Sequence, residues 1–322
     1  MILNKEAVPL VTVRCITYNQ VNFIRDCLEG FVSQNTSFPF EVVIHDDAST
    51  DGTKEVIEEY ASKYPEIIKP LYETENQWSK HNGIIAKLLQ DNSRGKYIAY
   101  CEGDDYWTNC LHLESMVSFL EQHDEVGMCY SKCRYYYEKE RKFDQKPWGG
   151  RGESFEELIK KNCVPTLSVV YRRNLDQKYL EYRDRCQGSS LWTMGDYPRW
   201  LWFSANSKVC FFNTVDGVYR VLTESASHST DISKRVKFIQ SYCTIRSKFC
   251  DDFANKKQKN KLKKLANNQC NWNLLTIYVK NGLMAEARLC HKKIVIYNIK
   301  SLAQYLFGYL MINISLVKII KT

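Results

Sequence analysis

The feature that most constrains the fold is a regular alternation of strand and helix patterns over the first hundred residues. Short apolar, β-branched runs predict buried strands at residues 9–16, 40–45, 67–72 and 96–101. Helical patterns follow the first three of these strands, at about residues 19–31, 53–64 and 82–89, and Asn19 can cap the first of these helices. This order predicts an α/β fold, in which helices cover both faces of a mainly parallel sheet.

Polar clusters stand where three of the predicted strands end. These clusters are Thr17-Tyr18-Asn19, Asp46-Asp47 and Asp104-Asp105. Because the carboxyl ends of parallel strands meet at one edge of a sheet, and ligands bind outside that edge, the three clusters should converge on one site.

Asp104 and Asp105 are adjacent carboxylates that repel each other unless a positive charge lies beside them. A divalent cation with oxygen ligands meets that need and can also bridge to a diphosphate. Gly103, just before them, permits a tight turn or the close approach of a ligand. The alternative is a capped turn with solvated acids, but the position after a buried strand favours a functional role.

Asp46 and Asp47 have two interpretations. Asp and Ser residues here can cap the next helix, and either Ser49 or Asp51 is expected to do so. One residue suffices as the N-cap, so a second carboxylate is left over at the sheet edge. It could accept hydrogen bonds from a nucleotide base or a ribose hydroxyl.

The rest of the chain changes character twice. Residues 126–221 mix strand patterns with helices, and from residue 232 onward the pattern is helical, with three or four helices. We expect a boundary near residue 228. The helical region contains a lysine cluster made up of Lys256, Lys257, Lys259, Lys261, Lys263 and Lys264.

The lysine cluster and the apolar tail allow three interpretations. A lysine run is commonly a solvated helix face. It can also bind an acidic surface such as the phosphate headgroups of a membrane leaflet. No nucleic acid partner is predicted, because no recognition module accompanies the cluster. The apolar stretch 294–320 is interrupted by polar residues and predicts surface contact with a membrane rather than a spanning helix.

The cysteines and the N-terminal residues indicate the cellular compartment of the protein. The 13 cysteines show no CxxC pair, and several, including Cys15, Cys101 and Cys210, sit in apolar runs as small buried side chains. Residues 1–9 lack the pattern of a signal peptide. We therefore expect reduced thiols in a cytoplasmic protein.

Three blocks of sequence resemble the inverting family 2 glycosyltransferases with the GT-A fold. The blocks are VTVRCITYNQ, EVVIHDDASTDGT and GKYIAYCEGDDYW, and their order and spacing cover about residues 8–110. The resemblance is weaker up to about residue 225 and does not include the C-terminal helices. It implies a GT-A domain at residues 1–228, with a donor half at 8–125 and an acceptor half at 126–228, followed by an α-helical region at 229–322.

The resemblance also implies roles for the clustered residues. Thr17, Tyr18 and Asn19 match the residues that line the nucleotide base, and Asp47, with Asp46 beside it, matches the acid that recognises the base, usually uracil. Asp104 matches the acid near the ribose and Asp105 the metal ligand, with Mn²⁺ or Mg²⁺ as the cofactor. Glu102 with Asp104 also forms the spaced Asp-x-Asp-type pair, so the pair that holds the metal stays open.

Further residues fall at positions that the family uses. His81 matches a basic residue near the diphosphate, although Lys80 competes for that role and His81 could equally be a loop residue without a ligand. Asp196, in Gly-Asp-Tyr-Pro, matches the general base that deprotonates the acceptor hydroxyl, and it also suits a helix start before Pro198. Arg220 matches a segment that closes the active site, and an ordinary surface loop is its alternative.

The resulting hypothesis is an inverting, metal-dependent transfer of one sugar from a nucleotide-diphosphate sugar, with UDP expected. The acceptor is a saccharide or a lipid-linked saccharide, and the resemblance implies bacterial polysaccharide or lipopolysaccharide assembly. The alternative is a silent nucleotide-sugar-binding protein of the same fold. A dinucleotide-binding oxidoreductase is excluded, because no GxGxxG follows the first strand. A processive synthase is disfavoured, because no QxxRW-type motif is present.

Overall fold

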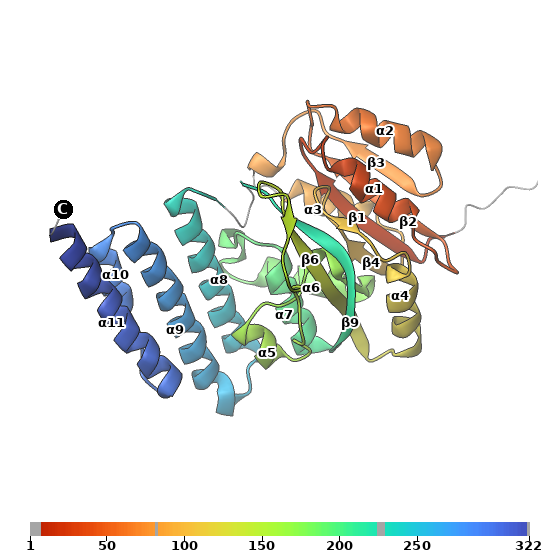
Figure 1. Cartoon of the computed structure of the whole chain (residues 1–322). Coiled ribbons are helices and arrows are strands. Elements are labelled where there is room, and N and C mark those ends of the chain that lie inside the picture. Colours follow the sequence, from red (N-terminus) through yellow and green to blue (C-terminus); the bar gives the residue numbers. More distant parts are fainter. Residues whose placement is uncertain (1–7, 81–82, 224–228, 321–322) are drawn as a thin grey trace, which may run out of the picture. The chain divides into compact units, whose positions relative to one another are not determined.

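The computed structural model describes residues 8–80, 83–223 and 229–320 (Figure 1). In these residues one nine-stranded sheet forms, in the order β3-β2-β1-β4-β8-β6-β9-β5, with β7 paired to β6. The strands are β1 (Val11–Thr17), β2 (Phe40–Asp46), β3 (Ile68–Tyr72), β4 (Tyr97–Tyr100), β5 (Tyr106–Trp107), β6 (Val126–Tyr137), β7 (Lys142–Phe143), β8 (Val170–Arg172) and β9 (Lys208–Val221).

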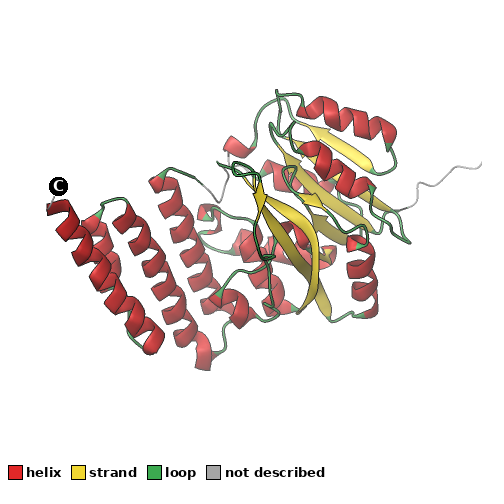
Figure 2. Cartoon of the chain, viewed as in Figure 1, coloured by secondary structure: helices red, strands yellow, loops and turns green. Residues whose placement is uncertain are grey.

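Helices make up most of the remaining secondary structure, as Figure 2 shows by colour. They are α1 (Ile24–Val32), α2 (Thr53–Lys63), α3 (Ile84–Asp91), α4 (His112–Gln122), α5 (Phe155–Lys160), α6 (Arg173–Arg185), α7 (Asp196–Asn206), α8 (Ile232–Phe253), α9 (Lys256–Lys280), α10 (Met284–Lys292) and α11 (Ile299–Ile320). Short 3₁₀ turns lie at η1 (Trp78–Lys80), η2 (Thr166–Ser168) and η3 (Ser189–Leu191).

The sheet is parallel where the sequence predicted it to be. Strands β3, β2, β1 and β4 pair in parallel, so the four predicted strands of the first hundred residues are confirmed. Strand β8 is antiparallel to both β4 and β6, whereas β9 again runs parallel to β6. The carboxyl ends of β1, β2 and β4 therefore meet at one edge, as the argument for a common site requires.

Alternate residues of the parallel strands face two helical layers. Val13 of β1 and Val42 of β2 belong to a core that also takes in apolar residues of α1, α2 and α4. On the opposite face, Val43 of β2 packs with Ile85 and Leu89 of α3. This two-sided burial explains why the strands read as continuous apolar runs rather than as alternating ones.

Two compact units divide the described residues. One lies within Met1–Ser154, Cys163–Arg183 and Asn206–Leu222 and contains all the strands named above. The other lies within Phe155–Asn162, Asp184–Ala205 and Thr223–Thr322 and contains α8 to α11, which Figure 1 shows in blue tones. The two units alternate along the chain, whereas we expected one boundary near residue 228. The domain division at 228 stays a prediction.

The starts of two helices differ from expectation. We expected Asn19 to cap the first helix, but α1 begins at Ile24 and Phe23 is its N-cap. Asn19 instead lies in a turn with a φ of 50°, a conformation that asparagine tolerates better than most residues. Gly52, rather than Ser49 or Asp51, is the N-cap of α2. Asp51 Oδ1 nevertheless accepts the N–H of Thr53, the first residue of α2, over 3.0 Å, whereas Asn19 and Ser49 link two loops.

Two cysteines correct the expectation of reduced thiols. Cys243 of α8 and Cys270 of α9 form a disulfide, so that expectation is wrong for this pair. Their sequence separation of 27 matches no spacing motif, because the pairing arises from the packing of two long helices. Cys15 and Cys101 are free and fully buried, as their apolar surroundings predicted, whereas Cys210 is only half-buried, contrary to expectation.

We expected no membrane-spanning helix in the apolar stretch 294–320. Among the described residues, no helix combines the length and the apolar character that crossing a bilayer requires.

Candidate donor-binding and metal site

The turn after β4 is held against the end of β1. The Gly103 N–H donates to the Ile16 carbonyl over 3.0 Å. A Cβ at Gly103 would lie 2.5 Å from Gln20 Oε1 and 2.7 Å from Thr17 Oγ1, so only glycine fits. The Thr17 hydroxyl donates to Gln20 Oε1 over 2.7 Å. The close approach predicted for Gly103 is therefore to the protein's own first loop.

Three carboxylates meet on this turn. One oxygen from each of Glu102, Asp104 and Asp105 lies within 4.8 Å of the others. Glu102 is exposed, Asp104 is half-buried and Asp105 is buried, so the group runs from the surface inward. An all-oxygen set of this kind matches the ligand preference of Mg²⁺ and Mn²⁺. The sequence left open whether the metal-binding pair is Asp104 with Asp105 or Glu102 with Asp104. Both pairs belong to this one cluster.

The electrostatics of the cluster favour a bound cation. Burial raises the pKa of the Asp105 carboxyl well above its ordinary value, and the charges of Asp104 and Glu102 raise that pKa further. Burial also raises the pKa of Asp104, although Arg220 and a hydrogen bond from Gln20 act in the opposite direction. Bringing a divalent cation to these oxygens would stabilise their ionised forms.

Arg220 of β9 braces the acidic turn from a distant part of the chain. Its backbone N–H donates to Asp105 Oδ1 over 2.8 Å, and its guanidinium donates to the Asp104 carbonyl over 2.9 Å. The guanidinium also pairs with Asp26 and lies 4.6 Å from the centre of the Tyr106 ring. Arg220 is 7% exposed, so the surface-loop alternative for this residue is wrong.

We expect Arg220→Gln to lower the free energy of unfolding by about 2 kcal/mol, measured by denaturant unfolding. Breaking a fully buried ion pair costs more, but Asp26 is 56% exposed and solvent compensates part of the loss. Arg134→Gln, at an exposed arginine of β6, is the control and should change stability by less than about 0.5 kcal/mol. Equal effects of the two substitutions would contradict the bracing role.

Behind the turn, a buried contact between a histidine and an aspartate anchors the segment that follows it. His112 Nδ1 lies 3.1 Å from Asp216 Oδ2, and Asn109 Nδ2 donates to Asp216 Oδ1 over 2.8 Å. Burial by itself would raise the pKa of Asp216, but the His112 hydrogen bond and charge lower it to about 2. The Trp107 indole N–H donates to the Leu167 carbonyl over 2.6 Å. Trp107 and His112 thus hold the segment that follows Asp105 in place.

Asp46 and Asp47 are both buried at the end of β2. Asp46 accepts hydrogen bonds from the N–H and the hydroxyl of Ser49. Asp47 accepts the Gln77 N–H on one oxygen, over 2.7 Å, and the Trp78 N–H on the other, over 3.0 Å. Each oxygen keeps a further lone pair. Asp47 therefore shapes the loop before α3, and its role towards a nucleotide base stays a prediction.

The first loop and the β2–α2 loop are tied together. Asn19 Oδ1 accepts the Thr50 N–H over 2.8 Å, and the Asn19 N–H donates to Ser49 Oγ over 2.9 Å. Tyr18, beside Asn19, is 46% exposed. Sequence reasoning missed Trp78, which is 56% exposed and follows the loop that Asp47 holds. In the sequence, the feature that could have identified it is a tryptophan within the polar loop 73–80.

Two of the predicted site residues stay untested. His81 lies outside the described residues, so its predicted contact with a diphosphate stays a prediction. Asp196 is half-buried and is the first residue of α7, as its helix-start pattern predicted. It belongs to the second compact unit, and its role as a base stays a prediction.

Comparison with protein families places these features in a known group. Residues 12–180 match the family described as glycosyl transferase family 2, and this match covers the β1 to β4 edge and its acidic turn. The chain belongs to glycosyl transferase family 2. The resemblance found in the three sequence blocks is therefore confirmed.

Two curated relatives illustrate the range of similarity. A Mycobacterium tuberculosis protein described as uncharacterized is 42% identical over 168 residues, which are 51% of this chain and 47% of that protein. The chain thus spans about half the length of this relative. The UDP-Glc:alpha-D-GlcNAc-diphosphoundecaprenol beta-1,3-glucosyltransferase WfaP of Escherichia coli is 30% identical over 223 residues, 68% of this chain and 80% of that enzyme.

Solved structures agree with the fold. TarS residues 1–349 of S. aureus, in complex with UDP-GlcNAc, match 96% of this chain and 91% of that chain with a TM-score of 0.56 at 15% identity. The mannosyltransferase PcManGT of Pyrobaculum calidifontis, in complex with GDP-Man and Mn²⁺, matches 94% of this chain and 80% of that chain, with a TM-score of 0.58 at 18% identity. The family 2 chain thus has the GT-A type α/β fold, followed by C-terminal helices.

Proposed function

We propose that this protein is an inverting, metal-dependent glycosyltransferase that moves one sugar from a UDP-sugar to an acceptor hydroxyl. The observation that carries the proposal is the meeting of Glu102, Asp104 and Asp105 at the carboxyl edge of the sheet. Three acids so close together are costly without a cation, and an edge of this kind is where a family 2 chain binds its donor. The E. coli relative, whose name includes UDP-Glc, supports the choice of nucleotide.

The residues present fit a divalent metal. Their carboxylate oxygens supply hard ligands, and burial together with the charges of Asp104 and Glu102 raises the pKa of Asp105, which supports a cation beside it. Asp105 and Asp104 would hold the ion, with Glu102 as the outer candidate. When bound, Mn²⁺ or Mg²⁺ supplies positive charge to the departing diphosphate. The Mn²⁺ in the mannosyltransferase complex supports this choice of cofactor.

The remaining chemistry belongs to side chains of this chain. Asp196 is the proposed general base, which takes the proton of the acceptor hydroxyl as that oxygen bonds to the anomeric carbon. The bond between the anomeric carbon and the diphosphate oxygen breaks in the same step, so the configuration inverts. Thr17, Tyr18, Asn19 and Asp47 are proposed to line the base, with Asp46 supporting the loop through Ser49.

The proposed acceptor is a saccharide or a lipid-linked saccharide in bacterial polysaccharide or lipopolysaccharide biosynthesis. The name of the E. coli relative describes a diphosphoundecaprenol-linked acceptor, which supports this class. We place the protein at the cytoplasmic face of the membrane, in peripheral contact through its C-terminal region. The Cys243–Cys270 disulfide removes the cysteine argument for this compartment, so the location rests on the proposed reaction.

Calorimetric titration with UDP tests the donor site. We expect UDP binding in the presence of Mn²⁺ and much weaker binding when the metal is chelated, because the diphosphate and the acid cluster repel each other without a cation. GDP is the matched control, and it should bind more weakly. Binding of GDP alone would contradict the proposed nucleotide. Binding of neither would contradict the donor site, and UDP binding without sugar transfer to any acceptor would favour the silent alternative.

A further inference from the structure

Helix α11 buries one face against its neighbours. Ser301 and Ile312 are buried, and Gly308 lies so close to α9 and α10 that a Cβ there would meet His291 at 3.0 Å and Leu275 at 3.2 Å. His291 of α10 also contacts the Tyr305 carbonyl through Nε2 over 2.8 Å. The orientation of α11 about its own axis is therefore set by packing.

The opposite face of α11 is exposed and apolar. At 100° per residue, the exposed positions from 299 to 314 form one broad stripe opposite Ser301, Gly308 and Ile312. The large apolar side chains of this outer face are Ile299, Leu302, Leu306, Phe307, Tyr309, Leu310 and Ile314, with exposures from 41% to 86%. Lys300 and Asn313 are the polar residues among these exposed positions. Exposed apolar surface of this extent marks an interaction site.

The charge of the surrounding region identifies the chemistry of the partner. Residues 254–322 contain thirteen lysines and arginines and a single acid, Glu286. The preceding 253 residues contain 36 acids and 32 lysines and arginines, so the positive charge of the chain is concentrated at this end. Lys259 and Lys263 pair with Asp251 of α8, but most of the excess stays uncompensated within the region. Such a region favours an anionic surface.

Cationic and apolar groups adjoin each other at the start of α11. Lys292, Lys293 and Lys300 are exposed and flank the exposed Val295 and Ile296. Among the described residues, no acidic group lies within 4.0 Å of these three lysine ammonium groups, which are therefore available to an external anion. Lysines beside a row of apolar side chains suit an interface where headgroup phosphates lie above acyl chains.

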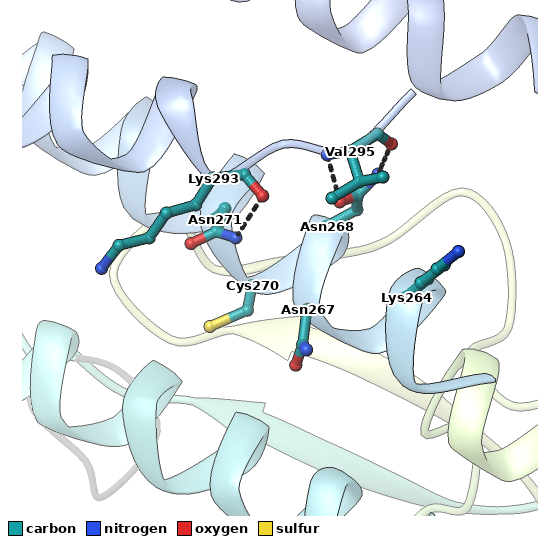
Figure 3. Close-up of a pocket in the computed structure, with 7 residues that line it drawn as sticks. All are labelled: Lys264, Asn267, Asn268, Cys270, Asn271, Lys293 and Val295. Carbon is teal, nitrogen blue, oxygen red and sulfur yellow. Dashed lines mark hydrogen bonds between the residues drawn. The ribbon is translucent and has the colours of Figure 1, made fainter. Parts of the chain in front are cut away.

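A pocket of about 380 Å³ lies at the same end, between α9 and the loop that leads to α11. Figure 3 shows its lining, in which Asn268 holds the backbone of Val295 through hydrogen bonds of 2.6 and 2.9 Å. Lys264 and Lys293 contribute positive charge to the pocket. The loop that presents Val295 is thus held in place by α9, so the basic and apolar groups keep their arrangement.

We infer that the outer face of α11, with Lys292, Lys293 and Lys300, is a docking surface for an anionic lipid membrane. The inference deepens the membrane contact in the proposed function and rests on it. A second copy of the chain is a less favourable partner for this surface, because a two-fold interface here would bring two strongly cationic regions together. In the membrane-bound state, the apolar outer face would lie among acyl chains with the lysines at the headgroups.

Vesicle co-sedimentation of the full chain tests the surface. The probes are vesicles of phosphatidylcholine alone and vesicles in which about one third of the lipid is phosphatidylglycerol, at low and high salt. We expect binding to the anionic vesicles at low salt, weaker binding at high salt, and little binding to phosphatidylcholine. No binding to the anionic vesicles at low salt would overturn the inference.

Two variants locate the contact. Leu306→Glu with Leu310→Glu should weaken vesicle binding at least about tenfold, because two leucines lose their burial in lipid. The matched control places the same substitutions at exposed leucines elsewhere, Leu111→Glu with Leu191→Glu, and should bind vesicles like the unmodified chain. Substituting Lys292, Lys293 and Lys300 by glutamine should weaken binding about fivefold for each lysine and reduce its salt dependence.

Two further readouts separate the possible outcomes. UDP calorimetry on the Leu306→Glu, Leu310→Glu variant should match the unmodified chain, so a failure of vesicle binding and a failure of the donor site are distinguishable. Sedimentation velocity reports self-association. If the unmodified chain is a dimer that this variant converts to a monomer, with vesicle binding unchanged, a second copy covers the outer face and the inference is overturned. Vesicle binding equal in this variant and the control would overturn it as well.

Discussion

Asp105→Asn should lower the rate of sugar transfer by about a thousandfold and remove the metal dependence of UDP binding. Asn keeps an oxygen that can accept the Arg220 N–H, so the turn should hold its shape. The substitution removes the negative charge that lies deepest in the cluster. The loss would therefore report on metal binding rather than on folding. Transfer assays and calorimetry with Mn²⁺ measure the two effects.

The control for this substitution is Asp124→Asn, at a side chain that is 97% exposed. It removes the same charge away from the acid cluster and should leave transfer and UDP binding within about twofold of the unmodified protein. An Asp105→Asn variant that transfers sugar at a normal rate would show that Glu102 and Asp104 suffice to hold the metal.

Asp105→Asn should also stabilise the protein in the absence of metal. Because the pKa of Asp105 is raised in the folded state, the folded protein binds more protons than the unfolded chain above the ordinary carboxyl range. Its stability therefore falls as the pH rises from about 4 towards the raised pKa. The variant should lose this decline and melt at a higher temperature near neutral pH. Mn²⁺ should raise the melting temperature of the unmodified protein more than that of the variant.

Asp196→Asn should lower the transfer rate by about a hundred- to ten-thousandfold and leave UDP binding unchanged. Asparagine cannot take the proton of the acceptor hydroxyl, but it can still occupy the first position of α7. Losing a carboxylate at a helix N-terminus costs about 0.3–1 kcal/mol, so the protein should stay folded. Transfer rates with saturating donor and UDP calorimetry separate catalysis from donor binding.

Glu286→Gln is the matched control, since it removes an acid from the first turn of another helix, α10, at an exposed site. Its stability should change by a similar amount while its transfer rate stays normal. If Asp196→Asn kept full activity, the general base would have to be another acid. If it lost UDP binding as well, a role restricted to proton transfer would be wrong.

Much of the first hundred residues could be predicted because the signals there are local. Apolar runs of strand length, helical periodicity and acids at strand ends placed the four parallel strands and the edge where Asp104 and Asp105 lie. Asn19 was assigned incorrectly, since a turn and a helix cap use the same polar residues and only the backbone distinguishes them. The grouping of Glu102 with both aspartates depended on the shape of the turn, which residue spacing does not specify.

The sequence by itself determined the order of strands and helices, the edge that carries the acids and the family, because each follows from residues close together in the chain. Tertiary structure alone decided that Arg220 holds Asp105 from 115 residues away, and that Cys243 and Cys270 join α8 to α9. It also decided which apolar face of α11 is buried and which is exposed. Large apolar residues occur on both faces, so the choice between them came from packing against α9 and α10.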